Sequence, residues 1–450
     1  MSNESEKLFD GVTNISDEVI GKAQKKQRRR WYRWAGPVAA VLAAAILIGV
    51  ISGRSGMNAY AIAEAEYPKG DTWVGWSSYA GTLDGFLTKS IPQFLSGAGE
   101  ENRVYSPLNV YMALSMLAEV TDGNTRAQIL DLLGVEDLGT QRERANAIWR
   151  NAYTDDKAKC LLGSSLWLNQ EINFVQSTMD TLAESYYASS YRGEMGSERF
   201  TKALQTWLNE RTGGLLQEQT EGVTLPADTV MAIAATLYFK DGWSAEFDKS
   251  ATAPDLFHAP GGERTVDFMH KTRVTGNYYR GERFGAVVWG FKGHDAMWFI
   301  LPDEGFSPDE LLADAEFLTF LCTGGSPWEN SRRVYLNLSI PKFDVVSDVD
   351  LRSGLIALGI TDAMDPAVSD YTPMTRDTDD VYLSKVLHAA RVKIDEEGCE
   401  AAAYTVEYTS NTAAPMAPEE EIDFVLDRPV LFAITGNDGL PLFVGVVNVP

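Results

Sequence analysis

Residues that commonly carry out catalysis or bind metals are few in this chain and form no recognised catalytic pattern. No Cys-x-x-Cys, His-Glu-x-x-His, Gly-x-Ser-x-Gly or phosphate-binding glycine motif occurs, and an odd number of cysteines does not indicate a disulfide framework. We therefore predict a protein that is not an enzyme, has no catalytic residue, and holds no metal or cofactor. The cysteines and histidines are Cys160, Cys322, Cys399, His258, His270, His294 and His388.

One stretch near the C-terminus suggests a different kind of chemistry. Residues 392–405 read VKIDEEGCEAAAYT, which begins as a strand with alternating apolar residues and continues with a glycine and three alanines. Alanine packs weakly, so an exposed alanine run gains little, but only small side chains could slide between two strands that are already packed. The residues alone leave a second interpretation open, an exposed helical turn, because Glu and Ala are good helix formers.

This stretch resembles the proximal hinge of the reactive-centre loop of serpins, the serine protease inhibitors that trap their target covalently. Further segments over roughly 70–450 resemble the same family, among them a strand followed by Ser106 and Pro107, which are a good N-cap and a good first helical residue. The resemblance implies one α+β domain with about nine helices, three β-sheets and an exposed loop at about 396–426. The largest sheet would have five strands and be metastable. The other segments are 123–129, 204–216, 231–243, 296–305, 334–343, 351–360 and 428–448.

In this family the loop acts as bait. A protease attacks a peptide bond in the loop and forms an acyl-enzyme, and the cut loop then enters the main sheet as an extra strand. The family's spacing implies that Thr412 is the residue attacked and that Ala413 follows it, fifteen residues from the hinge glycine counted inclusively. The implied hinge consists of Glu396, Glu397, Gly398, Cys399, Glu400, Ala401, Ala402 and Ala403.

The loop sequence restricts the class of protease. Thr412 is small and uncharged, which suits elastase-like and broad subtilisin-like pockets, and no Lys or Arg lies between Gly398 and Asp427 to suit a trypsin-like pocket. A cut around 414–416 is the alternative. Serine proteases are the expected covalent partners. Cysteine proteases are further candidates, because a thiol forms the same acyl intermediate.

Strand alternation predicts that every second loop residue faces the core after insertion. Cys399 and the small residues that share its face fit there, but Glu407 would be a buried carboxylate, which costs several kcal/mol unless it is paired or protonated. A second function therefore stays open, a non-inhibitory serpin-fold binding or surface protein whose loop is cleaved as a substrate.

The family also has a polar cluster where the main sheet opens. The resemblance implies that Ser106 and His388 belong to it, while Asn109 stands where a second serine is common and Ala235 where an asparagine is common. An asparagine that has moved to the helix would make Asn109→Ala lower the stability of the uncleaved form markedly. Trp243 would lie beneath the point where the loop enters, and Lys342 would pair with Glu396.

The composition of the N-terminal region predicts that it attaches the protein to a membrane. Residues 35–53 carry no charge and are long enough to span a hydrocarbon core of about 30 Å, and the basic end of 1–34 would stay cytoplasmic. We expect a cytoplasmic basic tail (1–34), a transmembrane signal-anchor (35–53), a tether (54–75) and a serpin domain (76–450) outside the cell, as on a bacterial surface. The alternative is secretion after signal cleavage near 59–61.

The charge limits the partners further. The chain has a net charge of -24; residues 1–54 hold nine Lys or Arg and five Asp or Glu (+4), so the rest carries -28. Such a surface repels nucleic acid, and no basic stripe offsets it. We expect no nucleic-acid partner and a monomer. An unrelated surface enzyme is the remaining alternative, and the missing motifs argue against it.

Overall fold

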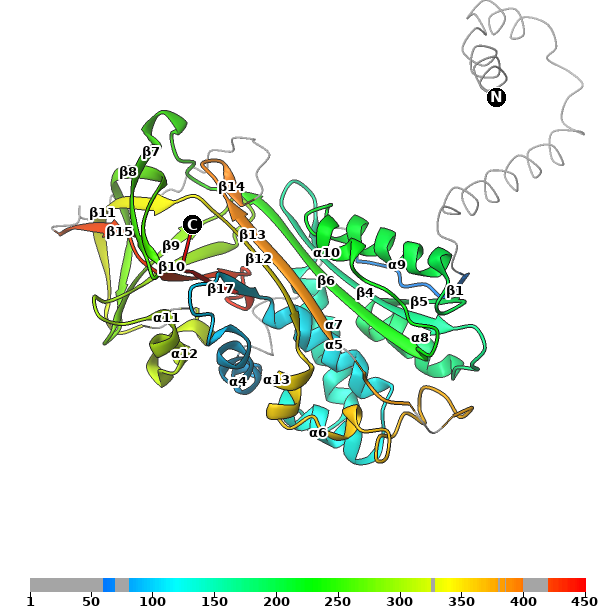
Figure 1. Cartoon of the computed structure of the whole chain (residues 1–450). Coiled ribbons are helices and arrows are strands. Elements are labelled where there is room, and N and C mark those ends of the chain that lie inside the picture. Colours follow the sequence, from blue (N-terminus) through cyan, green and yellow to red (C-terminus); the bar gives the residue numbers. More distant parts are fainter. Residues whose placement is uncertain (1–59, 69–80, 325–327, 379–380, 385, 400–419) are drawn as a thin grey trace, which may run out of the picture. The chain divides into compact units, whose positions relative to one another are not determined.

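A computed structural model describes residues 60–68, 81–324, 328–378, 381–384, 386–399 and 420–450. The chain divides into two compact units, Met1–Asn58 and Ala59–Pro450, and all described residues belong to the second. This unit is α+β, as predicted (Figure 1). Its α-helices in the described part are α4 (Asp84–Leu95), α5 (Pro107–Glu119), α6 (Gly123–Leu133), α7 (Leu138–Ala152), α8 (Gln176–Tyr186), α9 (Glu198–Arg211), α10 (Gln217–Glu221), α11 (Pro308–Leu312), α12 (Ala315–Cys322) and α13 (Arg352–Ala357), with 3-10 turns η1 (Lys249–Ala251) and η2 (Asp362–Met364).

The main sheet has the strand order β1-β5-β4-β6-β14-β13-β12, with β3 paired to β4. The five longest strands correspond to the five-stranded sheet expected from the sequence, and three short strands are added to it, of which β14 lies between β6 and β13. One of these, β1, pairs with β5 at the sheet edge, so this part of the predicted tether packs on the domain. The bounds are β1 (Tyr60–Ala63), β3 (Thr154–Asp155), β4 (Lys159–Asn169), β5 (Ala188–Gly193), β6 (Met231–Gly242), β12 (Phe343–Asp350), β13 (Leu387–Ile394) and β14 (Gly398–Cys399).

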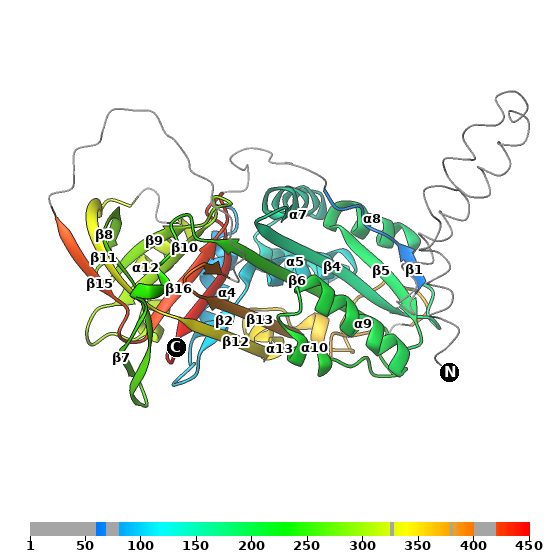
Figure 2. The same ribbon diagram turned by 90° about the horizontal axis from the view of Figure 1, so that it is seen from above.

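The second sheet has the order β15-β11-β8-β9-β10-β16-β17-β2, with β7 paired to β8. Its 19-residue strand β8 pairs with β7, β11 and β9, so the two smaller sheets expected from the sequence are joined into one in the described residues. Figure 2 shows this sheet to the left of the main sheet. The bounds are β2 (Arg103–Tyr105), β7 (Ala253–Ala259), β8 (Gly262–Arg280), β9 (Phe284–Gly290), β10 (Ala296–Pro302), β11 (Ser331–Pro341), β15 (Glu421–Val425), β16 (Val430–Thr435) and β17 (Pro441–Val447).

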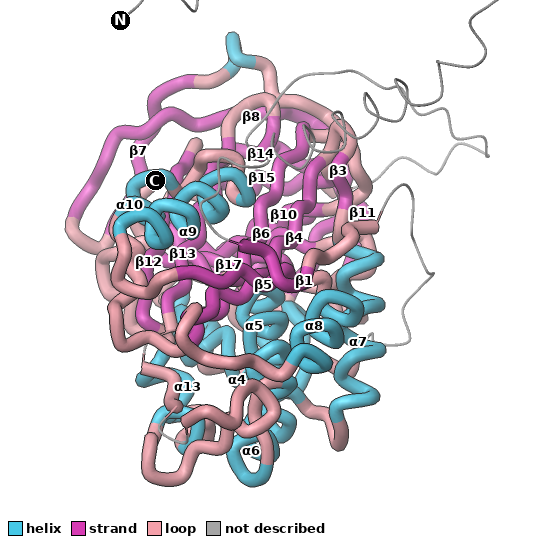
Figure 3. The backbone as a smooth tube through the Cα atoms, turned by 90° about the vertical axis from the view of Figure 1, so that its right-hand side faces the viewer, coloured by secondary structure: helices cyan, strands magenta, loops and turns pink. Residues whose placement is uncertain are grey.

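Helix α5 forms the centre of the core, because most of its side chains are apolar and buried. Ser106 caps it by accepting a hydrogen bond from the Asn109 backbone N–H at 3.4 Å, and Pro107 occupies its first turn. The helix contacts β6 of the main sheet and β17 of the second sheet. Figure 3 shows α5, α7 and α8 on one face of the main sheet and α9 and α10 on the other. A strand added to this sheet would therefore lie between two helical layers.

Within the described part of the chain, no helix combines the length and apolar character needed to cross a membrane. The predicted basic tail at 1–34 and the predicted anchor at 35–53 lie outside the described residues.

Candidate functional site

The site is the upper end of the space between β6 and β13. In the described residues these two strands are not paired with each other; the two-residue strand β14 lies between them, antiparallel to both (Figure 1). Cys399 is in register with Ile394 of β13 and with Asp241 of β6, and Gly398 lies opposite Gly242. The predicted hinge therefore starts as a strand at the position where an inserted loop would begin.

A tight turn brings the chain from β13 back into β14. The Asp395 carboxylate accepts hydrogen bonds from the backbone N–H groups of Glu397 at 2.9 Å and Gly398 at 3.2 Å. The Asp395 backbone N–H donates to the Gly398 carbonyl at 3.0 Å. An aspartate in this role stabilises a turn locally, so the reversal depends on residues next to each other in sequence.

Gly398 has almost no space around it. A Cβ at this position would lie 2.3 Å from the Asp241 carbonyl oxygen and 2.6 Å from Gly242 Cα. Both are backbone atoms of β6 and cannot move aside as a flexible side chain could. Glycine at this position is therefore what allows the hinge to lie against β6.

Trp243 lies at the entry point, where the sequence predicts it. Its side chain is fully buried and stacks on Phe291, with ring centroids 4.6 Å apart. Its indole N–H donates to the Asp395 carbonyl at 2.8 Å, and its backbone N–H donates to the Glu397 carbonyl at 2.9 Å. The tryptophan thus holds both sides of the turn that starts the hinge.

The Glu396 carboxylate is buried between two partners. Lys342 Nζ lies 3.3 Å from Oε1, as the sequence predicts, and the Thr252 hydroxyl donates to the same oxygen at 2.7 Å. Burial raises the pKa of Glu396, but the hydrogen bonds from Thr252 and Lys342 outweigh it and leave the pKa below its ordinary value. The neighbouring Glu397 pairs with Lys249. The sequence analysis did not predict that Thr252 and Lys249 would contact the hinge, because these residues lie about 145 positions before it and no local pattern connects the two segments.

The structure brings Ser106 and His388 together, 282 residues apart in sequence. The Ser106 backbone N–H donates to His388 Nε2 at 3.1 Å, and the Ser106 hydroxyl donates to the Leu442 carbonyl at 2.7 Å. Burial lowers the pKa of His388 from 6.5 to about 4. The imidazole is therefore neutral, with Nε2 as an acceptor that ties β13 to the start of α5.

Comparisons with known proteins agree with this geometry. The family model described as "Serpin (serine protease inhibitor)" matches residues 84–450. The chain belongs to the serpin family. Relatives include the leukocyte elastase inhibitor of Sus scrofa, 28% identical over 367 residues, which cover 78% of this chain and 93% of the relative. Serpin-ZX of Arabidopsis thaliana is 27% identical over 365 residues, covering 78% of this chain and 92% of the relative.

Solved structures show the same fold. The crystal structure of the thermophilic serpin tengpin in its native state matches with a TM-score of 0.73 and 23% identity, over 87% of this chain and 100% of tengpin. Serpins are mostly protease inhibitors rather than catalysts, although some do not inhibit.

Protonation of His388 is expected to weaken the uncleaved serpin. Because the folded-state pKa lies below the unfolded value, the stability that depends on the neutral ring is present above pH 6.5 and is lost as the pH falls toward 4. We expect a loss of about 3 kcal/mol over this range. Urea unfolding at several pH values measures it. His388→Gln does not titrate, so an unchanged pH slope in this variant would contradict the prediction.

The side-chain carbonyl of Asn109 makes no hydrogen bond to the cluster formed by Ser106 and His388. Its Oδ1 atom is buried, and no described residue donates a hydrogen bond to it. The proposed transfer of an asparagine from Ala235 to Asn109 therefore gains no support from this oxygen, and the expected large loss on Asn109→Ala needs correction. An unpaired buried acceptor is unfavourable, so its removal offsets any packing that is lost.

We now expect Asn109→Ala to change the free energy of unfolding of the uncleaved form by less than about 1 kcal/mol. Ser106→Ala removes a helix cap and a buried hydrogen bond, and should lower it by about 1–3 kcal/mol. Urea titration of the two variants side by side measures both. A larger loss for Asn109→Ala than for Ser106→Ala would restore the original hypothesis.

The remaining predicted site residues lie outside the described residues. These are Glu400, Ala401, Ala402 and Ala403 of the hinge, Glu407, and the reactive bond between Thr412 and Ala413. Beyond them, β15 pairs in parallel with β11. Glu420 forms an ion pair with Arg332 at 2.8 Å, and the Asn337 amide donates to Glu421 at 2.9 Å. Both ends of the loop are thus attached to the folded domain by charged or polar contacts.

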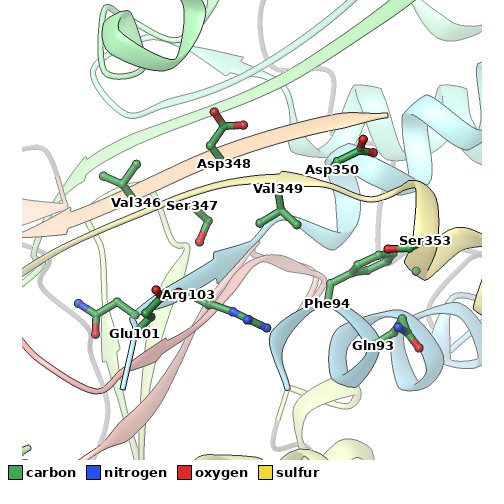
Figure 4. Close-up of a pocket in the computed structure, with 12 residues that line it drawn as sticks. Gln93, Phe94, Glu101, Arg103, Val346, Ser347, Asp348, Val349, Asp350 and Ser353 are labelled. Atoms are coloured by element: carbon green, nitrogen blue, oxygen red, sulfur yellow. The ribbon is translucent and has the colours of Figure 1, made fainter. Parts of the chain in front are cut away.

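A pocket of about 300 Å³ lies away from this site, between the edge strand β12, helices α4 and α13, and β2. Figure 4 shows the Arg103 side chain extending into it, below Ser347 and Val349. The guanidinium donates to the carbonyls of Ser96 at 2.6 Å and Gly97 at 3.0 Å. None of the predicted site residues lines this pocket. Within the described part of the chain, no group of His, Cys, Asp and Glu is placed to hold a metal ion.

Proposed function

We propose that this serpin is a suicide-substrate inhibitor of serine proteases, acylated at Thr412, whose cut loop enters the main sheet between β6 and β13. The observation that carries the proposal is the position of β14 between two strands that are otherwise unpaired in the described residues. A strand that is antiparallel to both neighbours can lengthen downward without any change in register. Insertion is then the continuation of a pairing that already exists in the uncleaved chain.

The energy of such an insertion is large enough to do mechanical work. About ten new backbone hydrogen bonds, at roughly 1 kcal/mol each, give on the order of 10 kcal/mol. This equals the whole stability of a typical domain. About fourteen inserted residues at 3.3 Å each would carry the attached protease roughly 45 Å, away from the geometry that deacylation needs.

The register of β14 gives a physical reason for the alanines. If this register continued along β6 and β13 after insertion, every second loop residue would lie over the apolar layer that faces α5. Only small side chains enter such a layer without displacing its members. The expected neighbours are Phe239 and Val392 for Ala401, and Leu237 and Ala390 for Ala403, all four buried in the uncleaved form.

The proposed targets are elastase-like or subtilisin-like proteases, because Thr412 is small and the loop lacks Lys and Arg. One relative is named leukocyte elastase inhibitor, which fits this class. Cysteine proteases are further candidates. We also propose that the protein is a monomer anchored in a bacterial cell membrane through residues 35–53, with the serpin domain outside. That position would expose the loop to extracellular proteases.

Glu407 favours a second candidate function, a non-inhibitory serpin. If the inserted loop continued the register of β14, Glu407 would lie opposite Ile233 of β6, on the inward face. A carboxylate there opposes insertion unless water reaches it. The same register puts Glu407 just beyond Leu387, the first residue of β13, so it would lie at the lower end of the sheet. We therefore rank inhibition first.

The test mixes the purified full-length chain, in mild detergent, with neutrophil elastase and with subtilisin. A denaturing gel shows whether a covalent complex forms, and mass spectrometry identifies the released C-terminal peptide. A covalent band with a peptide that starts at Ala413 is the expected result. A covalent band with another peptide moves the reactive bond but keeps the mechanism. Complete cleavage with no covalent band would overturn inhibition and support the second candidate.

A further inference from the structure

A turn of the second sheet packs against the end of β6, next to the hinge. It links β9 to β10 and covers residues 291–295. The Lys292 backbone N–H donates to the Gly242 carbonyl at 2.9 Å, and the Phe291 ring stacks on Trp243. Trp243 in turn holds both sides of the tight turn that starts the hinge. The position of the hinge therefore depends on how firmly residues 291–295 stay against β6.

In the described part of the domain, three carboxylates from separate segments meet at this turn. The Asp241 carboxylate, in the last turn of pairing of β6, accepts a hydrogen bond from the Gly293 backbone N–H at 2.6 Å. Asp295 ends the 291–295 turn and is partly buried. Asp438 comes from the turn between β16 and β17, and a Cβ at Gly436 would lie 3.0 Å from Asp438 Oδ1 and 4.0 Å from Asp295 Oδ1.

Other titratable groups that the described residues place at this turn are Lys292, His294 and Cys160 of β4. Burial raises the pKa of Asp241, and its backbone donors and the two nearby cations lower it only in part. Lys292 also pairs with Glu246 at 2.7 Å. His294 has a φ of 76°, in the left-handed region that residues other than glycine rarely adopt. The turn thus combines crowded carboxylates with a strained backbone.

Asp295 is the carboxyl group of this cluster that keeps a proton. Burial and the charges of Asp241 and Asp438 raise the pKa of Asp295 from 3.8 to about 7, against a smaller opposing effect of the hydrogen bond from the Asn437 backbone. Among the described residues, two backbone N–H groups donate to Asp241, and such bonds favour an ionised carboxylate. Because neighbouring carboxylates resist double ionisation, the proton stays on Asp295.

We propose that Asp295 makes the support of the hinge pH-sensitive. While its carboxyl group carries a proton, the 291–295 turn stays against β6. Once the proton leaves, the new charge repels the two neighbouring carboxylates and loosens the turn, so that the support of Trp243 and Gly242 weakens. The inference concerns the stability of the uncleaved chain and does not depend on the proposed insertion or on any protease.

The direction of the effect follows from the raised pKa. Because the folded-state pKa of Asp295 lies above its unfolded value, the stability that depends on this proton is fully present below pH 3.8 and is lost as the pH rises through 7. His388 acts in the opposite direction, since its contribution appears as the pH rises toward 6.5. Comparing each variant with the unsubstituted chain at every pH separates the two groups.

The experiment measures urea unfolding of the uncleaved full-length chain, in mild detergent, between pH 5 and pH 8. Asp295→Asn has the shape of the protonated acid, keeps an oxygen for the Asn437 N–H and does not titrate. We expect its unfolding equilibrium constant to diverge from that of the unsubstituted chain by roughly a hundredfold over this range, with the variant more stable at pH 8, because each pH unit between 5 and 7 contributes about a factor of ten.

Two control variants isolate the source of this change. Asp228→Asn removes an exposed carboxylate before β6, so it measures how much any lost negative charge helps a chain with a net charge of -24. His294→Gln removes the histidine at the turn, whose cation beside carboxylates would give a pH dependence of the same sign. We expect both controls to keep the pH dependence of the unsubstituted chain.

Hydrogen exchange of the Lys292 and Trp243 amides tests whether the effect reaches the hinge. After correction for the intrinsic pH dependence of exchange, both amides should exchange roughly tenfold faster at pH 8 than at pH 6 in the unsubstituted chain, and at a constant rate in Asp295→Asn. The inference fails if Asp295→Asn diverges no more than Asp228→Asn does, or if His294→Gln abolishes the pH dependence. Unchanged exchange at both amides would also overturn it, because the proton would then stabilise the chain without supporting the hinge.

Discussion

Gly398→Ala is expected to turn this serpin from an inhibitor into a substrate. The added Cβ would lie 2.3 Å from the Asp241 carbonyl oxygen, so β14 could not keep its place between β6 and β13. Insertion competes with deacylation, and each 1.4 kcal/mol added to the insertion barrier slows it about tenfold. We expect at least a tenfold rise in the number of serpin molecules cleaved per protease trapped. Titration of a target protease, with gel densitometry of the covalent band, measures that number.

The control for this substitution is Gly85→Ala. A Cβ at Gly85 meets no atom within 4 Å, and the residue lies in α4, where alanine is favoured over glycine. This variant should trap its target as well as the unsubstituted chain does. If Gly398→Ala also traps its target undiminished, the pairing of β14 with β6 is not the first step of insertion.

Thr412→Arg is expected to redirect inhibition to trypsin-like proteases. The pocket of such a protease contains a carboxylate that pairs with arginine at the attacked position, and the natural loop offers no basic residue there. We expect trapping of trypsin to rise by roughly a hundredfold or more, with a matching loss of elastase trapping. The second-order rate of inhibition of each protease measures the change.

The position of the arginine matters as much as its charge. Met416→Arg introduces the same side chain four residues later and has an alanine after it, so trypsin should cut there with a longer loop before the cut. If Thr412 is the reactive residue, this control gives cleavage with less covalent complex than Thr412→Arg. If Met416→Arg traps trypsin better, the reactive bond belongs in the alternative register around 414–416.

The parts that the sequence predicts well are those that depend on neighbouring residues. The cap and first turn of α5 follow from Ser106 and Pro107, whose preferences act within a few residues. The turn at Asp395 and the small residues after Gly398 are likewise a local pattern. Together with the family resemblance, such patterns were enough to predict the α+β fold, the place of Trp243 beneath the hinge and the pairing of Lys342 with Glu396.

Long-range pairing is what the sequence left undetermined. Nothing in the residues of β8 indicates that one strand serves three partners, and the predicted tether gave no sign that Tyr60–Ala63 would extend the main sheet. A strand pattern specifies which side chains face inward, but not which strand will lie beside it. The orphaned Oδ1 of Asn109 shows the same limit, because a residue type does not reveal whether a partner will be within reach.

The sequence by itself was enough to predict the family and the hinge, and it is the basis for proposing a bait that proteases with small pockets accept. Only the tertiary structure decided that β14 lies between β6 and β13 in the uncleaved chain, and that Thr252 and Lys249 hold the two glutamates of the hinge. The reason is physical. A residue type and its immediate neighbours are written in the sequence, whereas a strand pairing or a long-range hydrogen bond exists only where distant segments come within hydrogen-bonding distance.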